Sequence, residues 1–201
     1  MEKPLGVILA GGQARRMGGG DKGALAVGGV TLLDRVIDRL GPQVDRLVLN
    51  ANGDAARFAE YGLPVISDTL PDWPGPLAGV LAGMEYAAGA GYRHIVTAAA
   101  DTPFFPGDLV ERLARATERT GAPIALAATQ EGGRMTRHPT FGLWPTALRA
   151  DLRVALEDGL RKVVLWTDKH GAASAPFDDE AFFNVNTPDD LAEAERRASV
   201  E

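Results

Sequence analysis

A glycine-rich basic segment near the start of the chain has the composition of a loop that could bind phosphate groups. The stretch from Leu5 to Gly23 begins as an apolar run and continues through paired glycines, two arginines, further glycines and a lysine. Glycine lets backbone N–H groups approach phosphate oxygens, and Arg15, Arg16 and Lys22 add positive charge. The segment therefore predicts a phosphate-binding loop, although an ordinary turn with solvated basic residues has the same composition.

Two common phosphate motifs do not fit this loop. The P-loop pattern requires Gly-Lys-Ser/Thr, whereas Lys22 follows Asp21 and precedes Gly23, so the hydroxyl that would bind magnesium is missing. Gly18, Gly20 and Gly23 match the spacing of dinucleotide-binding loops, but they neither follow a strand directly nor open an evident helix. The loop is therefore of a different type.

A carboxylate follows a strand-like run in the middle of the chain. Asp101 comes directly after the residues IVTAAA and precedes Thr102 and Pro103. Ligands of open α/β sheets bind beyond the carboxyl ends of the strands, where this carboxylate would project. Mg²⁺ is usually held by one or two carboxylates together with substrate phosphates. Asp101 is thus a candidate magnesium ligand, and a cap of the following turn is the alternative reading.

Polar residues also follow two other predicted strands. The second strand ends in Asn50-Ala51-Asn52 and the third in Asp68. For Asn50 and Asp68, a ligand contact and an ordinary turn are equally compatible with the residue types. A basic glycine-rich loop and a strand-end carboxylate together indicate a nucleoside triphosphate with a metal ion, since nucleotidyl transfer needs positioning and charge neutralisation. Lys22 would stabilise charge on the transferred phosphorus and the leaving pyrophosphate, and Arg16 would bind the outer phosphates.

The elements that must position these groups alternate between strands and helices. We expect strands at 5–10, 46–51, 64–67, 92–100, 124–128, 138–144, 172–177 and 182–185, and helices at 32–40, 54–61, 76–90, 107–120 and 147–156. Thr31 and Thr187 are expected helix caps, and Pro188 begins the last helix. Residues 130–137 read as a polar turn, and 161–166 stay open between a strand and a helical turn. The alternation predicts a three-layer α/β/α sandwich with a mostly parallel sheet.

The composition restricts the class of protein. The 201 residues suffice for a single domain, 1–201, with 45% hydrophobic and 24% charged residues, as in an ordinary soluble globule. No cysteine is available for a disulfide, a thiolate metal site or a nucleophile. The net charge of −6 argues against a nucleic-acid partner, and no apolar run or signal-peptide layout suggests a membrane. We therefore expect a cytoplasmic protein.

Short motifs along nearly the whole chain resemble the signature of nucleotidyltransferases that act on sugar phosphates and cofactor phosphates. They are LAGG at 9–12, RMGG at 16–19, DKG at 21–23, PGPLAG at 74–79, DTP at 101–103, HPT at 138–140 and NVNTP at 184–188. Each motif alone is modest, but their order and spacing are specific. Together they resemble the molybdenum cofactor guanylyltransferases.

This resemblance implies a Rossmann-like α/β fold and transfer of GMP from Mg-GTP to the terminal phosphate of the molybdenum-pterin cofactor, with release of pyrophosphate. By this likeness, Asn50 and Asp68 would lie by the base or ribose, Asp101 would ligate Mg²⁺, and Asn184 or Asn186 would complete the metal or phosphate shell. The implied nucleotide- and cofactor-binding residues are Leu9, Ala10, Gly11, Gly12, Lys22, Asn50, Asp68 and Asp101, the catalytic residues are Lys22, Asp101 and Arg16, and the metal ligands are Asp101 and Asn184.

Two alternatives remain at this point. Gly11 stands where cytidylyl relatives carry Ala, and a missing methyl gives a purine room, but one methyl is worth only about 1–3 kcal/mol of discrimination. Cytidylyl transfer to the same cofactor is therefore the first alternative. The second is a regulatory nucleotide-binding module without chemistry, which Lys22 and Asp101 argue against, because binding alone would not require both.

The partners that follow from the resemblance are the small molecules GTP and the molybdenum-pterin cofactor, with transient contacts to other cofactor-biosynthesis or acceptor proteins. We expect a monomer. His94 and His170 have no partner spacing that supports catalysis, whereas His138 lies near Arg134 and Arg137 and is expected in a loop facing the anionic pterin.

Overall fold

The computed structural model describes residues 2–11, 22–70 and 75–199, with only the backbone of Lys22 and Glu131. The strands are β1 (Leu5–Leu9), β2 (Ala26–Val27), β3 (Val30–Thr31), β4 (Arg46–Asn50), β5 (Val65–Ile66), β6 (His94–Ala99), β7 (Ala125–Glu131), β8 (Arg134–Pro145) and β9 (Ala173–Pro176). The α-helices are α1 (Leu32–Leu40), α2 (Pro76–Gly89), α3 (Leu109–Thr120), α4 (Arg149–Glu157), α5 (Val163–Lys169) and α6 (Pro188–Ala198). Short 3₁₀ segments are η2 (Lys22–Ala24), η3 (Gly41–Gln43), η4 (Ala55–Tyr61) and η5 (Thr146–Leu148).

Within these residues, seven strands form one sheet in the order β5-β4-β1-β6-β8-β7-β9. The strands β5, β4, β1 and β6 are parallel, β8 pairs antiparallel with both β6 and β7, and β9 is parallel to β7. Strand β8 therefore runs against the other six strands of this sheet. The predicted α/β class with a mostly parallel sheet is confirmed.

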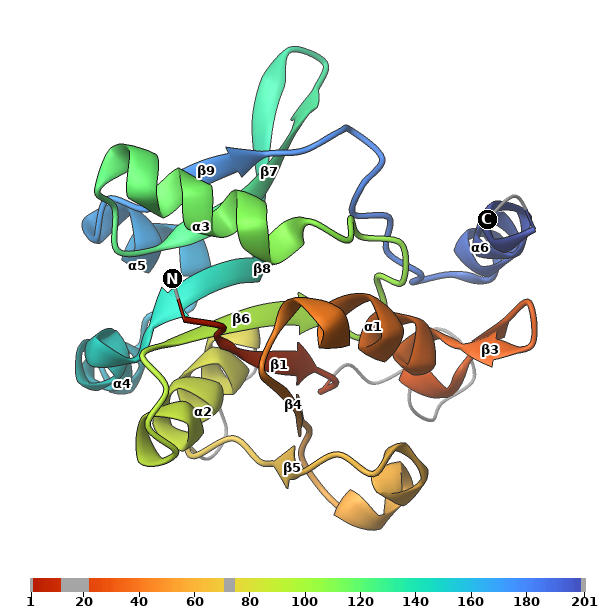
Figure 1. Ribbon diagram of the computed structural model, residues 1–201, viewed down its shortest axis with the longest axis horizontal. Coiled ribbons are helices and arrows are strands. Elements are labelled where there is room, and N and C mark those ends of the chain that lie inside the picture. Colours follow the sequence, from red (N-terminus) through yellow and green to blue (C-terminus); the bar gives the residue numbers. More distant parts are fainter. Residues whose placement is uncertain (1, 12–21, 71–74, 200–201) are drawn as a thin grey trace.

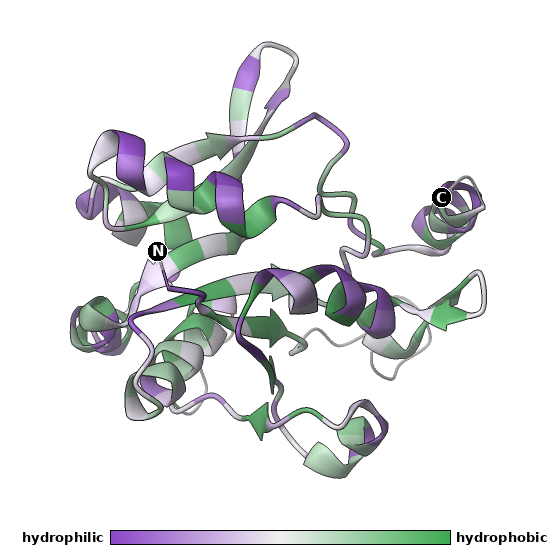
Figure 2. Cartoon of the chain, in the orientation of Figure 1, coloured by the Kyte–Doolittle hydropathy of each residue, from purple (hydrophilic) through white to green (hydrophobic). Residues whose placement is uncertain are grey.

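Two hydrophobic cores fill the spaces between the sheet and its two helix layers. Helices α1 and α3 cover one face of the sheet, and α2, α4 and α5 cover the other (Figure 1). Apolar residues make up most of strands β1 and β6, whereas polar residues line the outward sides of α1 and α3 (Figure 2). A strand buried on both faces needs such a continuous apolar run, and a covering helix needs only one apolar stripe. The predicted three-layer sandwich is confirmed.

The expected helix caps occur as the sequence predicts. The Thr31 side chain accepts a hydrogen bond from the backbone N–H of Asp34 at the start of α1. Thr187 and Asp190 form a reciprocal capping box around Pro188 at the start of α6. None of the helices in the described ranges combines the length and apolar character needed to cross a bilayer.

Two segments differ from the sequence-based expectation, and a third that was left open is resolved. The turn expected at 130–137 is wrong, because β7 and β8 continue through most of it and turn only at Gly132 and Gly133, whose φ angles are 58° and 79°. Positive φ at both central residues is what a tight two-residue hairpin requires. The strand expected at 182–185 is also wrong, because Phe182 and Val185 are buried in irregular backbone. Residues 161–166, left open above, enter helix α5 from Val163.

The chain reverses its direction of travel across the sheet at β1. It places β4 and β5 on one side of β1 and then returns to place β6 on the other. Ligands of open α/β sheets bind in the crevice at such a switch point, beyond the carboxyl ends of the strands. The ends of β1, β4 and β6 therefore form the edge where a ligand is expected.

Candidate active site

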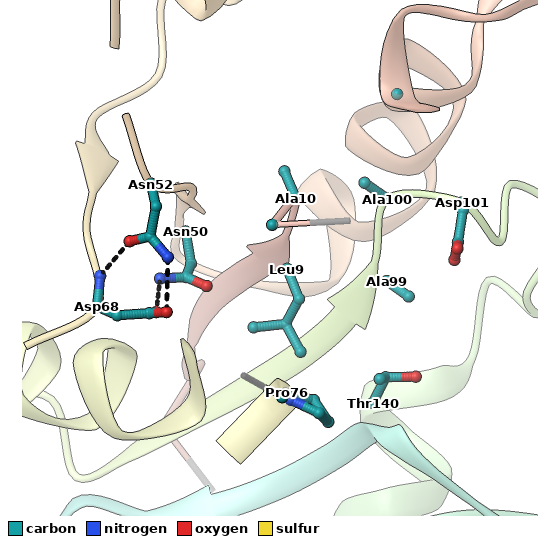
Figure 3. A pocket seen from close by; sticks show the side chains of 13 residues that line it. Leu9, Ala10, Asn50, Asn52, Asp68, Pro76, Ala99, Ala100, Asp101 and Thr140 are labelled. Atoms are coloured by element: carbon teal, nitrogen blue, oxygen red, sulfur yellow. Dashed lines mark hydrogen bonds between the residues drawn. The ribbon is translucent and has the colours of Figure 1, made fainter. Parts of the chain in front are cut away.

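A cavity of about 420 Å³ opens at this edge of the sheet. It is lined by Leu9, Ala10, Gly11, Gly23, Asn50, Asn52, Asp68, Gly75, Pro76, Ala99, Ala100, Asp101 and Thr140. Asn50, Asn52 and Asp68 lie together at one end and Asp101 lies toward the other, with Leu9 and Ala10 between them (Figure 3). The cavity thus has two polar ends joined by an apolar middle.

The first end is a closed set of hydrogen bonds among three side chains, which we call the amide–carboxylate cluster (Asn50, Asn52 and Asp68). Asn50 Nδ2 donates to Asp68 Oδ1 at 2.9 Å, and Asn52 Nδ2 donates to Asp68 Oδ2 at 2.7 Å. The backbone N–H of Asp68 donates to Asn52 Oδ1 at 2.9 Å. Both carboxylate oxygens therefore accept a protein hydrogen bond, which fixes the plane of the carboxylate.

Helix α2 contributes to this end through a glycine. A Cβ on Gly79 would collide with Asn50 Oδ1 and would lie 2.8 Å from Leu9 Cδ2. The Asn50 side chain thus packs directly against the helix backbone and is only 5% exposed. Only a residue without a side chain allows this approach, which explains the glycine at this place in the PGPLAG motif.

The middle of the cavity is the end of β1, held between its two neighbours. The backbone N–H of Ala10 donates to Asn50 O at 2.9 Å, and the N–H of Ala100 donates to Leu9 O at 3.1 Å. A Cβ added at Gly11 would meet nothing within 4 Å, so the described packing does not require glycine there. Because Gly11 lines the cavity, its missing methyl leaves room for a ligand.

The second end, which we call the Asp101 end, is formed by Asp101, Thr102 and Asn184. Asp101 is half-buried at the end of β6, and its backbone oxygen accepts a hydrogen bond of 2.8 Å from Val185 N. The Thr102 hydroxyl donates to Asn184 Oδ1 and lies 3.3 Å from Asp101 Oδ1. A buried threonine therefore brings the loop before α6 next to the strand-end carboxylate.

The donor set at this end is suitable for a magnesium ion. The described residues contain no group of three or more acidic or histidine side chains that could enclose a metal. Mg²⁺ does not need such a group, because it is commonly bound by one or two carboxylates with substrate phosphates and water. The Asp101 carboxylate and the Asn184 amide oxygen fit that requirement.

Several predicted site residues cannot be compared with the structure. Gly12 and Arg16 lie outside the described residues, and so does the side chain of Lys22. The backbone of Lys22 begins η2, next to Gly23, which lines the cavity. The structure brings together the other predicted residues, Leu9, Ala10, Gly11, Asn50, Asp68, Asp101 and Asn184, at one edge of the sheet.

None of the three histidines is among the residues that line the cavity, and His138 makes protein contacts within strand β8. His94 begins β6, at the end of the strand opposite the cavity, and burial followed by the charge of Arg93 lowers its pKa. His138 Nε2 lies 2.8 Å from Thr129 Oγ1, and its ring packs against Phe182. Arg137 donates to Ser174 Oγ and Asp168 Oδ1, so these protein partners occupy the guanidinium that the sequence directed toward the pterin.

Sequence reasoning missed three residues that line or build the site. Asn52 follows Asn50 by two positions, and a strand continued to that point would place both side chains on one face. Thr102 is the middle residue of the DTP motif, and Thr140 is the last of the HPT motif. Thr140 lies in an irregularity of β8, where Gly142 and His138 pair with the consecutive residues Leu126 and Ala127. Such bulges commonly redirect a side chain beside an active site.

The fold and the cavity define an α/β protein whose candidate ligand site lies beyond the carboxyl ends of a mostly parallel sheet. Residues 6–172 match the MobA-like NTP transferase domain family. The chain belongs to this family and is a nucleotidyltransferase.

Curated relatives support this assignment over nearly the whole chain. A molybdenum cofactor guanylyltransferase from Cereibacter sphaeroides is 53% identical over 192 residues, which cover 95% of each chain. Another from Nitrobacter hamburgensis is 48% identical over 202 residues, covering 98% of this chain and 95% of the relative.

Solved structures show the same fold. A molybdopterin-guanine dinucleotide biosynthesis protein A from Archaeoglobus fulgidus superposes with a TM-score of 0.75 at 24% identity, covering 98% of this chain and 100% of the other. A 4-diphosphocytidyl-2C-methyl-D-erythritolsynthase from Anaerococcus prevotii gives a TM-score of 0.77 at 13% identity, covering 98% and 96% of the two chains. The predicted Rossmann-like architecture is therefore shared with these two proteins.

Proposed function

We propose that this chain transfers GMP from Mg-GTP to the terminal phosphate of the molybdenum-pterin cofactor. The products are the guanine dinucleotide cofactor and pyrophosphate. The observation that carries this proposal is the 53% identity, over 95% of both chains, to a relative named molybdenum cofactor guanylyltransferase. The cavity supports it, since its two polar ends can serve a base and a triphosphate.

The amide–carboxylate cluster would take the base. Guanine carries N1–H and N2–H₂ donors next to each other on one edge, and a carboxylate offers two acceptor oxygens at matching spacing. Cytosine presents the N3 acceptor in the corresponding place, which a carboxylate would repel. A carboxylate at Asp68 and the space at Gly11 both favour guanine over cytosine in this role.

The Asp101 end would take the phosphates. In the proposed reaction, an oxygen of the acceptor's terminal phosphate forms a bond to the α-phosphorus of GTP, and the bond from that phosphorus to the pyrophosphate oxygen breaks. Asp101 and Asn184 would hold Mg²⁺, which neutralises triphosphate charge when bound. Lys22 and Arg16 would stabilise charge on the α-phosphorus and on the departing pyrophosphate.

Pyrophosphate release is the direct test. The protein is incubated with magnesium, the molybdenum-pterin acceptor and GTP, CTP, ATP or UTP in parallel reactions. We expect acceptor-dependent pyrophosphate release with GTP. Release with CTP in preference to GTP would replace guanylyl by cytidylyl transfer, and no release with any nucleotide would contradict the enzyme.

A further inference from the structure

We propose that Asn52 is a positioning residue that sets the base preference of the cavity by fixing the carboxylate of Asp68. The inference rests on the proposed function, in which Asp68 faces the base. It assigns a role to a side chain that acts through Asp68 and not on the reacting phosphate.

The contact between Asn52 and Asp68 is reciprocal. The Asn52 amide donates to Asp68 Oδ2 at 2.7 Å and accepts from the backbone N–H of Asp68 at 2.9 Å. Two hydrogen bonds in opposite directions fix both the position of the Asp68 backbone and the rotation of its carboxylate. Without them, only the hydrogen bond from Asn50 would hold the carboxylate, and its orientation would be less restricted, because the last torsion of an aspartate side chain is broad.

The two asparagines of the cluster are held very differently. Asn50 donates to Ile66 O as well as to Asp68 Oδ1, and it is packed against Gly79 inside the protein. Asn52 is exposed and lines the cavity. Its backbone is held separately, because Arg57 donates to Asn52 O at 2.8 Å. The Asn52 side chain can therefore be changed with little effect on the core.

The orientation of the carboxylate decides what it can recognise. Each carboxylate oxygen can accept about two hydrogen bonds, and Asn50 and Asn52 supply one donor to each oxygen. The remaining capacity is then divided between the two oxygens, which suits a base edge with two adjacent N–H donors. A fixed carboxylate also avoids the entropy cost of ordering it when the base binds. Asn52 thus holds the Asp68 carboxylate in the orientation that suits guanine before the nucleotide binds.

The first test is Asn52→Ala, measured by equilibrium binding of Mg-GTP and Mg-CTP and by steady-state turnover. We expect the Kd and KM for GTP to rise about tenfold, the size of one lost hydrogen bond to a charged group. The kcat at saturating GTP and the affinity for CTP should change less than about twofold, because the phosphate end is untouched. Thermal unfolding checks that the fold is retained.

A double-mutant cycle separates action through Asp68 from direct contact with the base. In an Asp68→Ala background, Asn52→Ala should cause no further loss of GTP affinity, because the group that Asn52 positions is gone. Additive losses would overturn the proposal, since Asn52 would then bind the nucleotide on its own.

An exchange of the two residues moves the carboxylate from position 68 to position 52 while keeping hydrogen bonds between the two side chains. In the double variant Asn52→Asp with Asp68→Asn, the new amide can donate to the new carboxylate and still accept from Asn50. We expect wild-type thermal stability with the preference for GTP over CTP lost. A retained preference would overturn the assignment of base selection to the Asn52–Asp68 pair.

Arg57→Ala is the matched control, since it removes a hydrogen bond to Asn52 O while leaving the Asn52 side chain in place. Arg57→Ala should leave the ratio of the GTP and CTP affinities unchanged. If it changed this ratio as much as Asn52→Ala does, the effect of Asn52→Ala would come from general loosening of the loop and the proposal would be overturned. The failure of the proposed function is seen separately, because the wild-type protein would then release no pyrophosphate from GTP with the pterin acceptor.

Discussion

The two ends of the cavity both present an aspartate after a parallel strand, but the protein holds the two carboxylates in different ways. At the amide–carboxylate cluster, both oxygens of Asp68 accept hydrogen bonds from asparagine side chains. At the Asp101 end, Asp101 is half-buried, Thr102 Oγ1 lies 3.3 Å from its Oδ1, and its backbone oxygen accepts a hydrogen bond from Val185 N. The Asp68 carboxylate is fixed by two asparagine side chains from another strand end, whereas the Asp101 carboxylate is contacted by the hydroxyl of the next residue in the chain.

This difference corresponds to the two tasks of the proposed reaction. Choosing one base requires a surface whose donors and acceptors are fixed before the ligand arrives, so the cost of ordering is not incurred on binding. Holding a metal with a triphosphate requires a carboxylate that keeps its charge available to the ligand. Variants at the two ends should accordingly alter different kinetic constants.

The largest effect is expected from Asp101→Asn, which keeps the side-chain shape and removes its charge. Turnover at saturating GTP should fall about 10²–10³-fold, as when one group that stabilises transition-state charge is removed. The measurements are pyrophosphate release at several magnesium concentrations and thermal unfolding. A loss of thermal stability large enough to explain the loss of turnover would contradict a role in the reaction. A change of base preference without a change of kcat would contradict the assignment of different tasks to the two ends.

A smaller effect is expected from Thr102→Val, which removes the hydroxyl that bonds Asn184. We expect kcat to fall about tenfold and the magnesium requirement to rise, because the Asn184 amide loses its neutral hydrogen bond and with it its place beside Asp101. Thr102→Ser keeps the hydroxyl and should retain near-wild-type turnover. If valine and serine behave alike, the hydroxyl does not position Asn184.

At the amide–carboxylate cluster, Gly79→Ala should alter nucleotide affinity and the stability of the protein more than turnover. The added methyl would collide with Asn50 Oδ1, so helix α2 or the amide must move, at a cost of about 1–3 kcal/mol of unfolding free energy. We expect the KM for GTP to rise several-fold with kcat nearly unchanged. Gly89→Ala on the same helix is the control, because a Cβ there meets nothing within 4 Å. A lower kcat with unchanged KM would show that the two ends are not independent.

The sequence was sufficient to predict the fold class and to select six residues that line the cavity: Leu9, Ala10, Gly11, Asn50, Asp68 and Asp101. Short apolar runs predicted the central strands, and polar residues after them marked the cavity edge, because parallel strands end at the same edge of a sheet. Asn50, Asp68 and Asp101 could be chosen on that ground alone. Thr31 and Thr187 could be predicted as caps because the cap is a local hydrogen bond to the next few residues.

The errors arose where non-local contacts decide the outcome. The polar residues around Gly132 and Gly133 suggested a loop, but the paired backbones of β7 and β8 keep them extended up to the turn. Phe182 and Val185 suggested a strand, yet Phe182 packs against Phe141 and Phe177 while Val185 packs with the residues around α6. The role of Asn52 was also missed, since the pairing of its side chain with Asp68 joins two loops that are distant in the sequence.

The smallest effect on activity is expected at Asp151, a carboxylate that is as strongly bonded as Asp68 but lies outside the cavity. Asp151 accepts hydrogen bonds of 2.8 Å from His170 and from Trp166 Nε1, and of 3.2 Å from Lys169. These bonds, that of His170 foremost, lower its pKa to about 2. Because the pKa is lower in the folded than in the unfolded protein, the stabilisation is complete above the ordinary aspartate pKa of about 4 and is lost as the pH falls toward 2.

Asp151→Asn should therefore reduce the unfolding free energy at pH 7 and flatten its decrease between about pH 4 and pH 2. The side chain is 39% exposed, so solvent screening limits the loss at pH 7 to about 1 kcal/mol or less. Turnover and base preference at pH 7 should be unchanged, because neither Asp151 nor its three partners lines the cavity. Urea unfolding across this pH range and pyrophosphate release at pH 7 measure the two effects. A changed base preference in Asp151→Asn would contradict the assignment of base selection to the amide–carboxylate cluster, because Asp151 lies outside the cavity.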